Sequence, residues 1–265
     1  MEYGPVVPAF LAGVMTWALT ALGASTVFLF KSAPTKLNYL TLGFAAGVMT
    51  SASFWSLILP ALEMSETFHE FKWLPVSLGF VIGVFFLRIV DYFLPHIHPY
   101  FKEGSYEGLR VDLKKYTLLF LAMTLHNIPE GLAIGVSYAA SFLDPSNLSH
   151  YSPYALAFGI GLQNLPEGMA VTFPLRKSGL SNFRSFLYGQ FSGAVEPVFA
   201  LIGAIATSFF SSALPYVMGF AAGTMIYVVI EDLIPESQSG GNTDIPTLGF
   251  MTGFLLMMIL DLSLG

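Results

Sequence analysis

The chain has 265 residues, of which 54% are apolar and only 11% charged, and it contains no cysteine. A soluble domain would carry roughly 25% charged residues, so this composition excludes a soluble globular fold and indicates a polytopic membrane protein. The lack of cysteine excludes disulfides and thiolate metal sites. The net charge of −6 comes without the interleaved basic and aromatic stretch that nucleic acid would need as a partner.

Apolar stretches long enough to cross the hydrocarbon core, which takes about 20 helical residues, recur along the whole sequence. We predict an all-α fold with eight transmembrane helices, at 6–30, 38–62, 74–95, 116–140, 154–175, 184–208, 213–234 and 247–264. They form a single transmembrane domain over 1–265. The first span is not expected to be a cleaved signal peptide, because its leading segment carries Glu2 and no basic residue.

The basic residues predict how the spans are oriented, because Lys and Arg concentrate in cytoplasmic loops. The opposite side has only Lys72, and Arg88 lies within the third span. The loops after the first, third, fifth and seventh spans together hold Lys31, Lys36, Lys102, Arg110, Lys114, Lys115, Arg176, Lys177 and Arg184. This bias predicts that both termini lie on the extracytoplasmic side and that 96–115 is a long cytoplasmic loop.

A short segment occurs twice, as LGFAAGVM at 42–49 and MGFAAGTM at 218–225. Each is followed by a proline and an acidic residue, Pro60 with Glu63 and Pro235 with Glu236. Because the predicted topology runs these two spans in opposite directions, we interpret the chain as a 3+2+3 arrangement with an inverted repeat, a recurring plan of secondary transporters. The alternative is a simple packing motif, since small residues four apart are common in packed membrane helices.

Two neighbouring spans carry one polar motif, LHNIPEGLAIG from Leu125 and LQNLPEGMAV from Leu162. Residues three and four apart share a helix face, so each motif presents a row of nitrogen and oxygen donors. The rows are His126, Asn127 and Glu130 on one span and Gln163, Asn164 and Glu167 on the next. Glu196, in the sixth span, and the pair Glu231 and Asp232, in the seventh, also lie beside prolines.

Carboxylates in these spans need a positive partner, because each unpaired one at mid-bilayer costs at least about 2.5 kcal/mol. Arg88 has its own partner three positions on, in Asp91. We therefore expect protons or metal cations to balance the other acids. Imidazole, carboxylate and amide donors suit zinc, iron, cobalt or cadmium, and Met49 could add a thioether. The amides could instead join helices by hydrogen bonds.

The two motifs, with GQFSGAVEP and GFAAGTMIYVVIEDLIPES after them, resemble the ZIP family of divalent metal transporters, most closely its bacterial GufA-like subgroup. The resemblance implies a 3+2+3 bundle in the cell (inner) membrane, zinc uptake into the cytoplasm, often a homodimer, and a binuclear metal site midway across. It assigns as ligands His126, Asn127, Glu130, Gln163, Asn164, Glu167, Glu196 and Met49, with Glu231 and Asp232 at a further position toward the exit. Many members carry histidine in place of Gln163 and some carry aspartate in place of Asn164, and the amides here are weaker ligands.

Two other functions are compatible with parts of this sequence. A transporter or channel of the same fold could prefer Mn²⁺, Fe²⁺ or another divalent cation such as Cd²⁺ or Co²⁺, although His126 and Met49 argue against magnesium, which prefers oxygen ligands. An intramembrane metallo-hydrolase would need about three zinc ligands and a general base. No H-E-x-x-H motif is present, and His126 is the only histidine deep in a span. We therefore expect a permease and not an enzyme.

Overall fold

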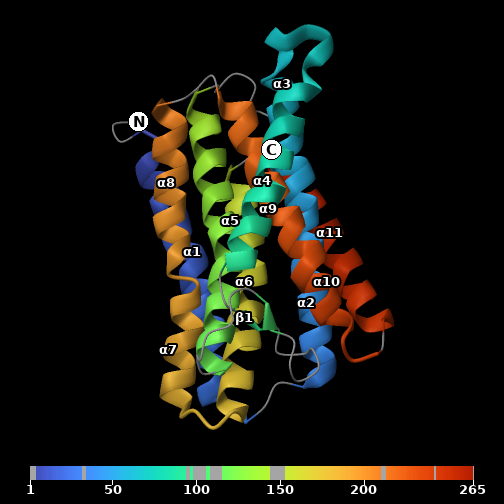
Figure 1. The fold of residues 1–265 in the computed structure, drawn as a ribbon. Helices are drawn as coiled ribbons and strands as arrows, with labels where there is room; N and C mark the ends of the chain where they lie inside the picture. Colours follow the sequence, from blue (N-terminus) through green and yellow to red (C-terminus); the bar gives the residue numbers. More distant parts are fainter. Residues whose placement is uncertain are drawn as a thin grey trace.

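The computed structural model describes residues 4–31, 34–93, 96–97, 106–107, 115–143, 153–209, 213–241 and 243–264. Nearly all of these residues are helical. The exceptions include two short strands, β1 (His96–Ile97) and β2 (Tyr106–Glu107), which pair antiparallel. The long helices lie side by side along one common direction and form a single bundle (Figure 1).

The described residues form a series of helices. In chain order they are α1 (Val6–Ser25) with η1 (Thr26–Phe28), α2 (Thr35–Ala52) with η2 (Ser53–Ile58) and α3 (Leu59–Glu63), η3 (Glu66–Phe71), α4 (Trp73–Phe93), α5 (Lys115–Leu143), α6 (Pro153–Lys177), α7 (Asn182–Ser192), α8 (Val195–Phe209), α9 (Leu214–Val228) with η6 (Val229–Leu233) and α10 (Ile234–Gln238), and α11 (Asp244–Leu264). Six helical stretches within the described residues are long and apolar enough to cross a membrane. The helices α5 and α6 have 29 and 25 residues, and they carry the polar motifs that an apolar span would lack.

The structure refines one expected segment and describes little of another. The stretch expected as one helix at 184–208 is divided, because α7 ends at Ser192 and α8 begins at Val195. Pro197 has no N–H for the carbonyl of Gly193, and that carbonyl accepts instead from Glu196 N at 3.0 Å in a tighter turn. Of the loop expected at 96–115, only β1, β2 and the first residue of α5 are among the described residues.

Prolines have different consequences in different helices. Pro129 and Pro166 lie inside continuous helices. Pro60 and Pro235 instead follow the π-helical segments η2 and η6, where wider turns accommodate the backbone carbonyls that proline cannot serve. Such π-helical turns are frequent at functional sites, and η6 contains two of the acidic residues singled out in the sequence.

Glycines bring pairs of helices into backbone contact. The closest pairs are α2 with α11, α4 with α9, α5 with α8, and α1 with α6. A Cβ added to Gly47 would collide with the carbonyl oxygen of Phe250 on α11, and one added to Gly223 would collide with that of Phe80 on α4. Gly47 and Gly223 hold the same place in the two copies of the repeated segment. The copies therefore make equivalent contacts, although the inverted repeat as a whole stays a prediction.

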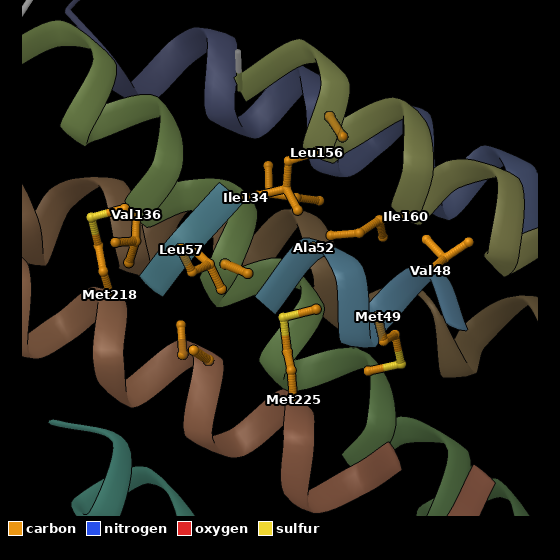
Figure 2. Packing of buried hydrophobic residues seen from close by; sticks show 14 of the residues in the cluster. Val48, Met49, Ala52, Leu57, Ile134, Val136, Leu156, Ile160, Met218 and Met225 are labelled. Carbon is orange, nitrogen blue, oxygen red and sulfur yellow. The ribbon is translucent and has the colours of Figure 1, made fainter. Parts of the chain in front are cut away.

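An apolar cluster lies where α2 and α9 face α5 and α6. Figure 2 shows Met49 and Ala52 of α2, Met225 of α9, Ile134 of α5 and Ile160 of α6 around this contact. The outer surfaces of the helices carry large exposed apolar side chains, among them Phe85 on α4 and Leu255 on α11. Such surfaces fit a hydrocarbon environment, so the polar residues between the helices stand out as the functional candidates.

Candidate metal-binding site

The residues of the two polar motifs are buried between α5 and α6. Glu130, Gln163 and Asn164 have no exposed surface, and the other three motif residues are at most 5% exposed. Glu196, in the first turn of α8, is also fully buried. A Cβ at Gly193 would come within 2.8 Å of Glu196 Oε1, so the glycine at the α7–α8 break makes room for this carboxylate.

Each motif amide of α6 donates a hydrogen bond to a carboxylate on another helix. Gln163 Nε2 donates to Glu130 Oε1 on α5 at 2.6 Å, and Asn164 Nδ2 donates to Glu196 Oε2 on α8 at 2.8 Å. Thr20 on α1 adds a 3.4 Å hydrogen bond from its hydroxyl to Glu196 Oε1. Two buried carboxylates are thus held by neutral donors.

Several buried side-chain oxygens of this site have no donor within the described part of the chain. They are Asn127 Oδ1, Glu130 Oε2, Gln163 Oε1, Asn164 Oδ1 and Glu167 Oε2. All five can only accept hydrogen bonds when the acids are ionised, and a buried acceptor left unpaired is costly. A group of acceptors without donors is an environment that a cation would stabilise.

The described residues contain no group of three or more histidine or acidic side chains already arranged to hold a metal ion. The hydrogen bonds above give the reason. Glu130 and Glu196 each face an amide N–H₂ group, and Glu130 is close enough to Glu167 and Glu196 for their charges to repel. A metal that enters would have to replace these amide donors.

His126 connects the motif on α5 with the acidic segment η6. Its Nδ1 lies 2.8 Å from the carbonyl oxygen of Ala122, and its Nε2 lies 2.9 Å from Asp232 Oδ2. A tetrahedral zinc bound to His126 Nε2 and Asp232 Oδ2 would hold these two atoms about 3.4 Å apart, given bonds of about 2.1 Å. A shift of roughly half an ångström would therefore turn this pair into two ligands of one metal.

The remaining expected ligands lie in different surroundings. Met49 is fully buried within the apolar cluster (Figure 2). Glu231, next to Asp232 in the chain, is half-buried and points to Arg88, whose Nη1 lies 4.0 Å from Glu231 Oε1. The structure thus brings Asp232 to His126 but leaves Glu231 outside that contact.

One buried acid near the site escaped the sequence analysis as a ligand candidate. Glu236 on α10 is 4% exposed and lies within electrostatic range of His126, Asp232 and Glu167. The sequence contained a signal for it, because Glu236 directly follows Pro235, just after the predicted end of the seventh span. Its distance from the motifs along the chain concealed the contact.

Comparison with known proteins identifies the family of the chain. Residues 102–261 match the family model described as ZIP zinc transporter. The chain is 37% identical to the zinc transporter GufA of Myxococcus xanthus over 96% of this chain and 98% of that protein. It is 40% identical to the zinc transporter ZIPB of Bordetella bronchiseptica, covering 97% of this chain and 81% of that protein, and 35% identical to the human zinc transporter ZIP11 over 99% of both.

These similarities extend over nearly the whole chain. They confirm the family expected from the sequence, the membrane-embedded helical fold and a role in transport and not in catalysis. With its buried oxygen-rich site between apolar helices, this chain belongs to the ZIP family of zinc transporters.

Proposed function

We propose that zinc crosses the membrane between α5 and α6 and binds there to side chains of the two polar motifs. The observation that carries this proposal is the group of five buried oxygens without a hydrogen-bond donor among the described residues. An unpaired acceptor in a membrane interior costs free energy. Such a group is therefore expected only where a cation binds, at least transiently. A divalent cation supplies that charge and accepts both carboxylate and amide oxygens as ligands.

Zinc binding requires the two amides to turn. In the structure the Gln163 amide directs its N–H₂ group to Glu130 Oε1. Rotation of this amide would bring Oε1, which has no donor here, toward the same space as the carboxylate. The amide therefore provides a neutral partner for Glu130 before the metal arrives and an oxygen ligand afterwards.

We assign two adjacent metal positions to these residues. The first would use His126, Glu130, Gln163 and Glu167, with Met49 contributing its sulfur after a local movement. The second would use Asn127, Asn164 and Glu196 and share the motif glutamates. Support for the second position comes from the unpaired Asn127 Oδ1 and Asn164 Oδ1. It has two neutral amide ligands and no imidazole, so it should bind zinc less tightly than the first.

Asp232 and Glu231 would receive the metal after it leaves the motifs. The 2.9 Å contact between His126 Nε2 and Asp232 Oδ2 supports a direct transfer from α5 to η6. Because the basic residues concentrate at the end of the bundle with the α6–α7 connection, we assign that end to the cytoplasm and both termini to the other side of the cell (inner) membrane. A homodimer remains part of this proposal.

The ligand set also suits several related metals. A single imidazole among carboxylate and amide oxygens would accept Cd²⁺, Fe²⁺, Mn²⁺ or Co²⁺ as well as Zn²⁺. Sites of this kind distinguish metals less strictly than sites with several histidines, because oxygen donors suit both hard and intermediate cations. Zinc is the primary cargo proposed here, with these ions as competitors.

Metal flux into proteoliposomes tests the proposal. Wild-type protein should take up zinc, whereas Glu130→Ala and Glu167→Ala should each lose most of that flux. Glu70→Ala, which removes an exposed carboxylate of η3, is the matched control and should retain it. A metal panel, measured with and without a pH gradient, would rank the competing ions. Wild-type flux in both motif variants would contradict the assignment of α5 and α6.

A further inference from the structure

Arg88 lies at the end of α4 that faces the acidic segment η6. Its Nη1 is 3.4 Å from Asp91 Oδ2, one turn further along α4, and 4.0 Å from Glu231 Oε1. The same nitrogen lies 3.5 Å from the hydroxyl of Tyr227 on α9. One guanidinium therefore contacts two carboxylates and connects α4 with α9 and η6.

Asp91 contacts this guanidinium and also lines a cavity with the histidine of the α5 motif. Tyr227 donates its hydroxyl hydrogen to Asp91 Oδ2 at 3.3 Å. Asp91 and Tyr227 also line a cavity of about 10 Å³ that is shared with His126 and Asp232. A space of this size holds about one water molecule. Asp91 thus shares the lining of one small cavity with the His126–Asp232 pair.

A structural ion pair is the simplest explanation of these contacts, but Asp91 also lines the cavity of the motif histidine. The Arg88 side chain is 57% exposed, whereas that of Asp91 is 9% exposed. The position of the pair at the edge of the His126–Asp232 cavity calls for another function.

We propose that Arg88 is a tethered cation that occupies the far end of the metal pathway and that metal must displace to leave. This inference rests on the proposed function, because it takes the His126–Asp232 contact as the last step before release. Without the guanidinium, Asp91 and Asp232 would line one small cavity together with His126, with Glu231 next to Asp232 in the chain. Such a group would retain a divalent cation, and transport needs sites that bind a cation but also release it.

Arg88 is accordingly a positioning residue and not a metal ligand. Its charge keeps Asp91 and Glu231 paired in the metal-free protein, and an arriving cation exchanges with it. Arginine suits this function because its fork of N–H donors contacts several oxygens at once, and because it stays protonated under physiological conditions. Lysine at this position would keep the charge but contact fewer oxygens.

Equilibrium binding of Cd²⁺ to the purified full-length protein in detergent tests the proposal. Arg88→Gln should bind one more Cd²⁺ per chain than wild type. Its affinity for this ion should be at least about tenfold above that of any wild-type site at the end of α4 that faces η6. The variant should also release the ion more slowly on dilution into chelator. Arg88→Lys should bind as wild type does. Arg88→Gln combined with Asp91→Asn should lose the additional ion. Lys72→Gln, which removes the same charge from an exposed position at the other end of α4, should gain no ion.

Two outcomes would overturn the proposal. The first is an unchanged Cd²⁺ stoichiometry in Arg88→Gln, and the second is a gain that persists in the double variant. If Arg88→Gln fails to fold, Tyr227→Phe provides the same test, because loss of the hydroxyl loosens Arg88 from Asp91 and should raise Cd²⁺ affinity by about two- to threefold. Unchanged affinity in Tyr227→Phe would then count against the proposal. Failure of the proposed function would look different, since Glu130→Ala would then leave zinc flux intact whatever residue occupies position 88.

Discussion

Gln163 and Glu130 face each other between α6 and α5, with the amide nitrogen donating to the carboxylate at 2.6 Å. Both side chains are fully buried. The neutral amide thereby occupies a position next to Glu130 where a metal ligand is expected. This relationship explains how a membrane helix can hold Glu130 without a permanent cation, and it predicts that the residue at position 163 influences metal preference.

Replacement of Gln163 by histidine should strengthen zinc binding. An imidazole nitrogen is a softer and stronger ligand for zinc than an amide oxygen, so zinc affinity should rise on the order of tenfold. Mn²⁺ should gain much less. Competition between Zn²⁺ and Mn²⁺ for uptake into proteoliposomes measures the change. Gln163→Leu is the control without a donor or ligand, and it should lose uptake of both ions; an unaltered preference in Gln163→His would mean that position 163 does not contact the metal.

Asn164→Asp should make stability depend strongly on metal. The new carboxylate would lie beside Glu196, to which Asn164 now donates at 2.8 Å, so the metal-free protein should lose about 1–3 kcal/mol of stability. Zinc should restore it, because two carboxylates and a divalent cation neutralise one another. Thermal unfolding with and without zinc would show a larger shift for the variant than for wild type. Asn164→Leu is the comparison, and it should be destabilised in both conditions.

Gly47→Ala and Gly223→Ala should both destabilise the bundle. The added Cβ would collide with a backbone carbonyl on the partner helix in each case, and such overpacking costs typically about 1–3 kcal/mol. Gly159→Ala is a suitable control, because the atom its Cβ would meet is the Met257 sulfur at the end of a flexible side chain. Thermal unfolding in detergent should rank Gly159→Ala well above the other two in stability. Equal stability of all three variants would show that the backbone contacts are looser than described.

Zinc affinity should decrease as the pH falls. Ligands bind metal only in their deprotonated forms, so protons compete with zinc at His126 and at the motif glutamates. The expected decrease lies between about pH 7 and pH 5, the range in which an ordinary histidine titrates. Equilibrium dialysis of the purified protein at several pH values measures it. His126→Gln should bind zinc more weakly at pH 7 and show a shallower dependence, and a steep unchanged profile in that variant would assign the competition to the carboxylates alone.

The sequence predicted the elements of the site better than their neighbours in space. His126, Asn127 and Glu130 could be placed on one helix face because helical periodicity is local, and their burial followed from the apolar residues around them. The contact of His126 with Asp232 joins residues more than a hundred positions apart, and no periodicity specifies such a pair. Glu236 was missed as a ligand candidate for the same reason.

The prolines show a second limit of sequence interpretation. Each removes one backbone donor, but the helix responds in three ways: Pro129 lies in a continuous helix, Pro235 follows a π-helical turn, and Pro197 follows a break. Which response occurs depends on what the neighbouring helices offer to the unpaired carbonyl. That information is tertiary, so a proline predicts a local irregularity without predicting its form.

Methionines at the apolar contact between α2 and α9 on one side and α5 and α6 on the other have a mechanical consequence. Met49, Met218 and Met225 are almost completely buried there (Figure 2), and their unbranched thioether chains can refill space in several conformations. The glycine contacts that hold α2 to α11 and α9 to α4 allow no such adjustment, since carbonyl groups meet them directly. Relative movement of the helices should therefore cost the least free energy along the contact lined by these methionines, where α5 and α6 could slide past α2 and α9. The pairs joined by glycine contacts would each move as a rigid unit.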